Sequence, residues 1–158
     1  MFRNPKLAAV IYACQQEKEP VLELSSSMDI GEHPGCNRGE IYIFTNADKV
    51  RMYKNDRFIK EYTATDSPYT HLKHGPILID DFIGDALQEE HMKPGQEAGV
   101  KKALNAFTRF GFAKLPKSIY ATGIWLILRY HMNMEEAVRL YNQYIGDWGG
   151  TSTTYRFE

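Results

Sequence analysis

The sequence predicts an α+β protein in which a partial immunoglobulin-like β-sandwich carries an inserted block of about four helices. Three observations lead to this fold class. Residues 40–62 place their side chains with the period of two that is typical of strands. Residues 76–148 instead repeat their apolar side chains with the helical period of 3.6. Residues 151–158 then return to strand-forming side chains, so the helical block interrupts a β-unit.

The N-terminal residues predict a short helix followed by a first strand. Asn4 and Pro5 are a helix-start signal, because Asn can cap a helix and Pro suits its first position. The helix that follows carries apolar residues on most of its sides, so we expect it to pack on a larger body. Residues 21–24 are expected to form a strand and residues 25–38 a loop.

Residues 40–62 predict a β-meander of three strands that forms one side of the sandwich. The run Asn46-Ala47-Asp48 marks the first turn, since short polar side chains bond to their own backbone. Asn55 and Asp56 mark the second turn. A two-residue hairpin loop at that place needs positive φ angles, which both residue types tolerate.

Four amphipathic helices are expected between residues 71 and 150. Their apolar faces consist of Ile79, Phe82, Ile83, Ala86 and Leu87 in the first, Val100, Ala103, Leu104 and Phe107 in the second, Tyr120, Ile124, Ile127 and Leu128 in the third, and Ala137, Leu140, Tyr141, Tyr144 and Ile145 in the fourth. Gly111 ends the second helix and Pro116 opens the third. Asn133 and Glu136 resemble a capping box for the fourth, which Gly146 ends.

Composition and charge exclude several classes of function. The 158 residues suffice for one core or two small units, and the 43% hydrophobic and 25% charged contents are ordinary. A net charge of −1 provides no basic footprint for nucleic acid. No apolar run approaches the roughly 20 residues of a membrane span. We therefore expect no nucleic-acid or membrane partner and a cytoplasmic location, with Cys14 and Cys36 reduced.

Residues 1–62 resemble the region that follows the catalytic barrel in glycoside hydrolase family 2, the β-galactosidase and β-glucuronidase family. The segment MFRNPKLAAVIYACQ resembles the last barrel helix of those enzymes, and Glu19-Pro20-Val21 opens a strand as it does there. The run FTNADKVRMYKND, residues 44–56, resembles a hairpin of the family's immunoglobulin-like domain. The final strand, from Thr153, fits the same domain.

The resemblance implies a division of the chain. Residues 1–18 would end the barrel domain, residues 19–70 and 151–158 would form an incomplete immunoglobulin-like sandwich, and residues 71–150 would be a helical insertion. Asp56 departs from the family, which usually has Gly there. The helical block is absent from the better-known members and is similar to an insertion in a bacterial subgroup. Because two of about seven strands are missing and both ends are abrupt, we expect a fragment of a longer protein.

The resemblance implies a non-catalytic C-terminal module of a parent enzyme that hydrolyses β-glycosides, with β-galactosides or β-glucuronides as the expected substrates. The family uses two glutamates about 5 Å apart, both in the barrel. Its acid/base motif is an Asn-Glu pair, which does not occur here, so no catalytic residue is carried over and no cofactor is expected. The alternative is a free-standing module that binds carbohydrate or another protein.

The expected partners of the module are its own barrel domain, a carbohydrate, and a second copy of the chain paired through open sheet edges. Asn46 and Asp48 are candidates for the substrate cleft, because the family counterpart of their loop approaches the active-site face. An ordinary β-turn would explain them as well. Trp148 is a candidate for sugar stacking or docking, since flanking glycines let its ring project. It could equally fold back onto the helices.

Two further groups of polar residues have simpler explanations than a functional site. Asp80, Asp81 and Asp85 contain an adjacent acid pair, but neighbouring residues on a helix point about 100° apart. A position in the first helical turn, where the helix dipole favours carboxylates, explains them more simply. His71 and His74 have a spacing suited to a metal ion but no third ligand nearby, so no metal site is expected.

Overall fold

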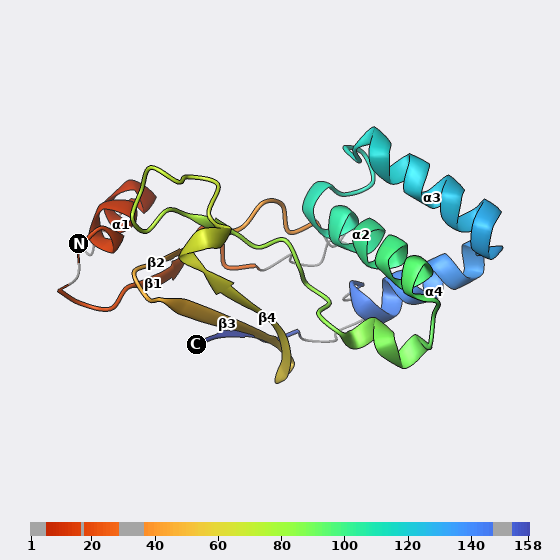
Figure 1. Cartoon of the computed structure of the whole chain (residues 1–158), viewed down its shortest axis with the longest axis horizontal. Coiled ribbons are helices and arrows are strands. Elements are labelled where there is room, and N and C mark those ends of the chain that lie inside the picture. Colours follow the sequence, from red (N-terminus) through yellow and green to blue (C-terminus); the bar gives the residue numbers. More distant parts are fainter. Residues whose placement is uncertain (1–5, 17, 29–36, 147–152) are drawn as a thin grey trace.

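The computed structural model describes residues 6–16, 18–28, 37–146 and 153–158. The molecule is elongated, with a β-part at one end and a helical block at the other (Figure 1). Both ends of the described chain belong to the β-part. Helices and antiparallel sheets are both present, so the predicted α+β class is confirmed.

The β-part contains two antiparallel three-stranded sheets. The first sheet has the order β1 (Leu22–Leu24), β2 (Tyr42–Thr45) and β5 (Ile77–Leu78). The second has the order β4 (Arg57–Thr63), β3 (Lys49–Lys54) and β6 (Tyr155–Phe157). The C-terminal residues therefore form the predicted strand, with Phe157 opposite Met52 on β3.

The predicted meander is wrong in one respect, because β2 and β3 lie in different sheets. β3 and β4 form the expected hairpin, whereas β2 pairs with β1 and β5. The hydroxyl of Thr45 donates to the carbonyl of Val21 at 2.9 Å and accepts from the N–H of Ala47 at 3.0 Å. These bonds turn the chain out of the first sheet, so residues 46–48 cross between the sheets instead of reversing the chain within one.

The β3–β4 hairpin closes with the predicted loop. Asn55 and Asp56 have φ angles of 48° and 62°. Two consecutive positive φ angles are typical of the type I′ turn, whose twist matches that of the strands it joins. The side chain of Asn55 also accepts a hydrogen bond from the N–H of Thr154 at 2.8 Å, which guides β6 onto the free edge of β3.

The two sheets share one hydrophobic core. Its buried members are Met28, Ile41, Ile43, Val50, Met52, Ile59, Tyr62, Ile77, Ile79 and Phe82. The helix α1 (Leu7–Cys14) covers the other face of β2, where Val10 and Cys14 pack against Phe44. Ile43 and Phe44 thus point to opposite faces of β2, as alternation along a strand requires. The N-terminal helix is confirmed, and it packs on a larger body as expected.

Three of the four predicted helices are confirmed. They are α2 (Pro94–Phe110), α3 (Lys117–Tyr130) and α4 (Met134–Tyr144). Gly111 ends α2 with a φ of 63° and Pro116 precedes α3. At the start of α4 the side chain of Asn133 accepts a hydrogen bond from the N–H of Glu136 at 2.7 Å, which is the Asn133 half of the capping box that the sequence predicts.

The first predicted helix, over Ile79–Leu87, is absent. Residues 77–78 form β5, residues 86–90 form the short 3₁₀ helix η2 (Ala86–Glu90), and no helix is assigned to residues 79–85. The helical spacing of the apolar residues arises because they serve two cores in turn. Ile79 and Phe82 pack between the sheets, whereas Ile83 and Leu87 pack among the helices.

Gly84 shows why this segment is not a helix. Its φ is 59°, outside the right-handed helical region. A Cβ atom at this position would lie 2.9 Å from the Cα of Ile59, so the chain passes directly over the backbone of β4. Residues 77–79, which the sequence assigns to the helical block, consequently belong to the β-part.

Candidate functional site

The side chain of Asn46, a predicted cleft residue, is engaged within the chain. Its Oδ1 accepts a hydrogen bond from the N–H of Val21 at 2.8 Å. Its Nδ2 donates to the carbonyls of Gln16 and Glu19 at 2.9 and 2.7 Å. The three bonds tie the segment between α1 and β1 to the turn between β2 and β3. Asn46 thus positions α1 on the sheets, and a role in a substrate cleft stays a prediction.

The other two predicted site residues are Asp48 and Trp148. Asp48 is exposed in the same turn, immediately before β3. Trp148 lies outside the described residues, so its stacking or docking role stays a prediction. The structure therefore brings Asn46 and Asp48 into one turn, as their closeness in the sequence requires.

Asp81 is a buried structural carboxylate at the junction of the β-part and the helices. It is 9% exposed. Its Oδ1 accepts hydrogen bonds from the N–H groups of Ile83 and Gly84 at 3.0 and 3.1 Å and from the Asn105 amide at 3.1 Å, and Lys101 lies 2.7 Å from Oδ2. Burial opposes ionisation, but the bonds from Lys101 and the backbone outweigh it and lower the pKa of Asp81.

Asp80 and the two histidines also make contacts within the chain. Asp80 forms an ion pair with Lys60 at 2.8 Å and accepts a hydrogen bond from the hydroxyl of Tyr62 at 3.2 Å. Burial, and secondly the charge of Asp80, raise the pKa of Tyr62, which remains protonated. The backbone of His74 is bonded to the side-chain amide of Gln15. The first-turn explanation for the aspartates fails with the missing helix, since both lie in a loop.

Within the described ranges, His, Cys, Asp and Glu side chains form no group of three that could hold a metal ion. Across the same residues, no helix is both long and apolar enough to cross a membrane. Among the described residues, the polar clusters that the sequence singled out therefore form neither a pair of carboxylates facing one substrate nor a set of ligands for a metal ion.

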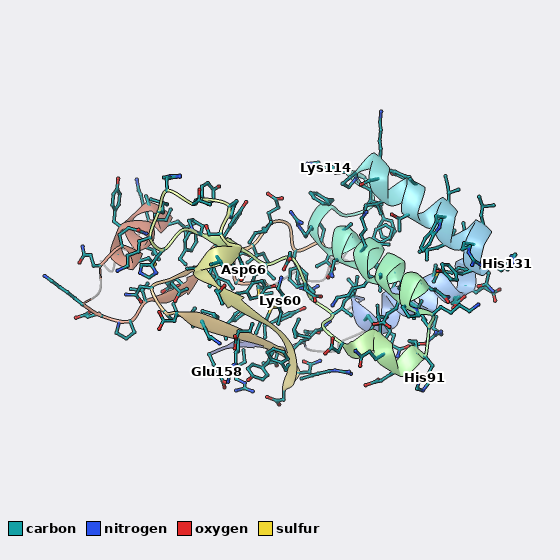
Figure 2. All side chains as sticks on the ribbon, in the orientation of Figure 1. Lys60, Asp66, His91, Lys114, His131 and Glu158 are labelled. Carbon is teal, nitrogen blue, oxygen red and sulfur yellow. The ribbon has the colours of Figure 1, made fainter. Side chains whose placement is uncertain are left out.

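The surface that stands out instead is the outer face of α3. The four apolar residues predicted to share a face of this helix do so, but the face is exposed. The exposed fractions are 56% for Tyr120, 59% for Ile124, 54% for Ile127 and 73% for Leu128. Lys114 and His131 mark the two ends of the helix (Figure 2).

Glycines in α2 explain which face of α3 is buried. A Cβ atom on Gly99 would lie 3.0 Å from Leu126, and one on Gly95 would lie 2.5 Å from the hydroxyl of Tyr130. These two glycines, one turn apart, let α3 approach α2 closely with its Leu126 side. Trp125 packs edge-to-face on Tyr130 at a centroid distance of 5.0 Å, beside the same contact. On the opposite side of α3, Tyr120, Ile124 and Ile127 stay exposed and line a hollow toward α4.

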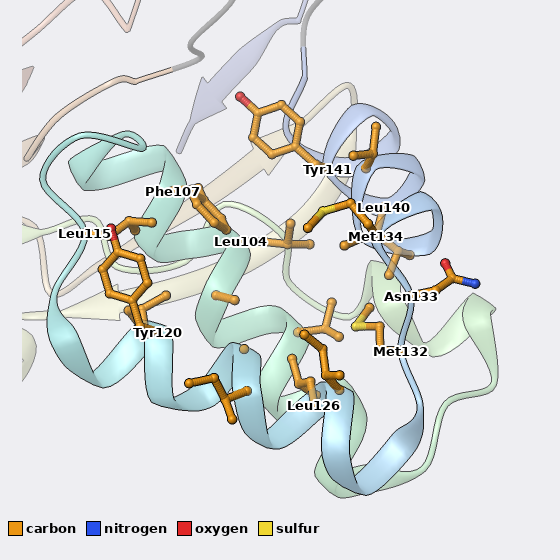
Figure 3. A pocket seen from close by; sticks show the side chains of 18 of the residues that line it. Leu104, Phe107, Leu115, Tyr120, Leu126, Met132, Asn133, Met134, Leu140 and Tyr141 are labelled. Atoms are coloured by element: carbon orange, nitrogen blue, oxygen red, sulfur yellow. The ribbon is translucent and has the colours of Figure 1, made fainter.

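An apolar groove of about 420 Å³ runs between α2, α3 and α4. The side chains of Leu104, Leu126 and Leu140, one from each helix, project into the space between the helices (Figure 3). The remaining lining residues are Val100, Ala103, Phe107, Phe112, Leu115, Ile119, Tyr120, Gly123, Ile124, Ile127, Met132, Asn133, Met134, Ala137, Val138 and Tyr141.

The chemistry of the groove favours an apolar occupant. Asn133 is the one amide among its lining residues, and the hydroxyls of Tyr120 and Tyr141 are the other polar side-chain groups. A sugar carries several hydroxyl groups around its ring and needs hydrogen-bond partners for them, because an unpaired polar group in an apolar site is costly. The groove has the volume and apolar lining of a ligand or docking site but not the polarity of a sugar site.

Comparison with known proteins identifies no relative of this chain. We found no match to a protein-family model, to a curated protein or to a solved structure.

The composition of α3 indicates the groove, although the helical spacing of its residues does not. The residues of α3 are apolar on nearly every side, KSIYATGIWLILRY. A helix that is apolar all round is normally enclosed by other elements. Only Ile119 and Leu126 of α3 are buried. The excess of apolar residues therefore indicates a helix whose apolar surface is only partly buried by α2.

Proposed function

We propose that the chain is a non-catalytic module of a family 2 glycoside hydrolase, whose parent enzyme hydrolyses β-glycosides such as β-galactosides or β-glucuronides. In this proposal the β-part is an incomplete immunoglobulin-like domain and α1 is the last helix of the catalytic barrel. The module supports the barrel or shapes its substrate cleft. The helical block is an insertion into the domain, and the protein is cytoplasmic.

The observation that carries this proposal is the attachment of α1 to the sheets. The two stretches that resemble the family, the N-terminal helix and the segment 44–56, are bound together by the three hydrogen bonds of Asn46 and by the packing of Val10 and Cys14 on Phe44. A barrel helix fixed to the following domain would transmit the position of that domain to the barrel. The two sheets around one core support the sandwich part of the proposal.

The exposed side of α1 fits a barrel that lies against it. Tyr12 is 74% exposed and Leu7 is 45% exposed, although α1 has an apolar sequence. A short helix of this kind gains little stability in water alone, and it gains more when both sides are packed. Asp80 and Asp81 are engaged in ion pairs with Lys60 and Lys101. The family resemblance assigns catalysis to glutamates outside this chain.

The test uses the gene that encodes residues 1–158 together with its flanking reading frame. We expect the frame to continue upstream through a barrel that contains an Asn-Glu pair. The longer protein should hydrolyse a chromogenic β-galactoside or β-glucuronide, and the isolated chain should hydrolyse neither. Hydrolysis by the isolated chain, or stop codons on both sides without a barrel, would refute the proposal.

A substitution on α1 tests the packing. Tyr12→Lys should lower the thermal stability of the longer protein and leave that of the isolated chain unchanged, because Tyr12 is already exposed there. Lys18→Glu, at an exposed position outside α1, is the matched control. If the longer protein has the same thermal stability with Tyr12→Lys as in the wild type, the barrel does not pack on this side of α1.

The second candidate function is a free-standing interaction module, and the apolar groove favours a protein partner over a carbohydrate. Calorimetric titration of the isolated chain with mono- and oligosaccharides separates the two kinds of module. We expect no heat of binding. Saturable sugar binding that Trp148→Ala abolishes would instead establish a carbohydrate-binding module.

A further inference from the structure

The helical block exposes more apolar surface than a monomer of this size normally tolerates. Within the described part of the block, the exposed large apolar residues are Phe112, Tyr120, Ile124, Trp125, Ile127, Leu128, Met134 and Val138, with exposed fractions between 42% and 74%. Half-exposed side chains of this size together present on the order of 800 Å². The largest apolar patch of a typical monomer is about 300–600 Å². The summed area of these eight side chains, called the patch below, is close to the roughly 800 Å² per partner of a stable interface.

A small molecule in the groove would not cover this surface. Trp125 and Leu128 do not line the groove, yet they are 42% and 73% exposed on the same helix. The patch therefore combines a hollow, between α3 and α4, with a ridge along α3. A partner that covers both must place a ridge in the hollow between α3 and α4 and a hollow over the ridge of α3. A second copy of the chain presents both shapes.

The charges at the two ends of α3 favour an antiparallel arrangement of two copies. Lys114 and Lys117 are exposed at the start of α3, whereas Glu135 and Glu136 follow its end at the start of α4. The 14 residues of α3 place these opposite charges about 20 Å apart. A two-fold axis through the middle of α3 sets the basic end of one copy against the acidic end of the other.

The other cations near the acidic end are directed elsewhere. The guanidinium of Arg129 lies over the ring of Tyr130, at 5.6 Å, on the side of α3 that faces α2. The guanidinium of Arg139 pairs with Glu90 of η2 at 2.7 Å. These contacts leave the acidic character of the start of α4 in place.

The middle of α3 has the residue that close pairing requires. Gly123 lies at the midpoint of Lys117–Tyr130, lines the groove, and would have no neighbouring atom within 4 Å of an added Cβ. The backbone of a second helix can approach at this point without meeting a side chain. Ile124 and Ile127 on either copy then pack around the axis.

We propose that the chain forms a two-fold symmetric dimer in which α3 of each copy lies in the groove between α3 and α4 of the other. The interface places Lys117 of one copy beside Glu135 of its partner, twice by symmetry. It completes the helical block as a bundle of helices from two copies. This inference does not depend on the hydrolase assignment, because it uses only the apolar patch and the charges that flank it.

The test measures the oligomeric state by sedimentation equilibrium over a range of concentrations. We expect the wild-type chain to be a dimer. Ile124→Glu and Leu128→Glu, at positions that are 59% and 73% exposed and so leave the fold unchanged, should each raise the dimer Kd at least about 100-fold. Circular dichroism spectra identical to wild type establish that these variants are folded.

Controls on the sheets distinguish this interface from pairing through open strand edges. Leu22→Glu on β1 and Phe58→Glu on β4 replace apolar residues that are 41% and 47% exposed on edge strands. They should leave the dimer intact. Dissociation by these variants, with Leu128→Glu remaining dimeric, would move the interface to the sheets and refute the proposal.

A charge exchange tests the antiparallel register. Lys117→Glu alone and Glu135→Lys alone should each weaken the dimer, by roughly 3- to 10-fold in Kd for exposed charges. The double variant should recover the wild-type Kd, since each new Glu again faces a Lys of the partner. A wild-type chain that sediments as a monomer at high concentration, or a double variant weaker than both single ones, contradicts the dimer described here.

Discussion

At the scale of single residues, Asn46 connects two separate parts of the chain through three hydrogen bonds. Its amide uses one acceptor and two donor bonds, all to backbone groups of the segment between α1 and β1. The described residues between α1 and β1 belong to no helix or strand, so this side chain holds them to the turn between β2 and β3. The adjacent Thr45 adds bonds to Val21 and Ala47 that turn the chain toward the second sheet.

Replacement of Asn46 should therefore destabilise the protein. Asn46→Ala removes all three bonds, and we expect a loss of about 1–3 kcal/mol in the free energy of unfolding. Asn46→Asp keeps the acceptor for Val21 but places a carboxylate against the carbonyls of Gln16 and Glu19, so it should be no better than Ala. Urea denaturation measures both. A change below about 0.5 kcal/mol, the range of ordinary surface substitutions, would deny Asn46 this role.

At the scale of elements, the turns and caps of the chain follow local rules, whereas the helix faces do not. The Asn55-Asp56 loop, the Gly111 end of α2 and the Asn133 cap of α4 lie where the residue types predict them. α3 differs, because its buried face is selected by the glycines of α2. Those glycines are 18 or more residues away in the sequence, and nothing in α3 itself identifies them.

The hairpin loop contains a residue that can be improved. Asp56 adopts a φ of 62°, which costs a residue with a Cβ more than it costs glycine. The side chain of Asp56 is 93% exposed and lies 3.7 Å from Arg156, so little attraction is lost with it. Asp56→Gly should raise the free energy of unfolding by about 0.5–1 kcal/mol.

The control for this substitution is Asp48→Gly, at an exposed turn residue that is not among those with positive φ. It should be neutral or destabilising, because glycine there only increases the entropy of the unfolded chain. Thermal denaturation of the two variants beside wild type makes the comparison. A lower Tm for Asp56→Gly than for wild type would contradict the type I′ explanation.

At the scale of the whole molecule, polar contacts join the β-part to the helical block. Lys54 of β3 donates to the carbonyl of Tyr144 at 2.8 Å, and Arg109 of α2 pairs with Glu40 at 2.8 Å. The Asp81 network lies between them and connects the loop after β5 with α2. Because Asp81 is the buried member of this set, it dominates the pH dependence of the junction.

The sign of that pH dependence follows from the direction of the shift. The pKa of Asp81 is lower in the folded chain than the value near 3.9 of an unfolded Asp. Its contribution to stability is therefore complete above about pH 5 and disappears as the pH falls below about 4. Asp81→Asn, which keeps the shape but cannot pair with Lys101, should cost on the order of 2 kcal/mol at pH 7.

The measurement is the difference in the free energy of unfolding between wild type and Asp81→Asn, from urea denaturation at several pH values. We expect this difference to shrink from pH 6 to pH 3. Asp85→Asn, at an exposed position in the same loop, should stay within about 0.5 kcal/mol of wild type throughout. A difference that stays constant with pH would show that the carboxylate charge does not stabilise the junction.

The sequence by itself determined the features that depend on near neighbours. These are the α+β class, the hairpin at Asn55-Asp56, the cap at Asn133 and the C-terminal strand, since each follows from residue types a few positions apart. Of the polar residues that it singled out, Asn46 was visible as a turn residue, whereas Asp80 and Asp81 were expected in the first turn of a helix that is not present. Apart from the N–H groups of Ile83 and Gly84, their partners could not be read from the sequence, because those partners lie about 20 or more residues away.

Only the tertiary structure decided where the surfaces lie. Residues 79–87 have helical spacing but divide between two cores, because Gly84 crosses the backbone of β4 and Asp81 binds the N–H groups that a helix would use. β2 and β3 were separated into two sheets by the bonds of Thr45. The outer face of α3 became a groove because close packing on Gly95 and Gly99 turned Leu126 inward. A local sequence pattern is compatible with more than one structure, and contacts between residues distant in the sequence decide which of these structures forms.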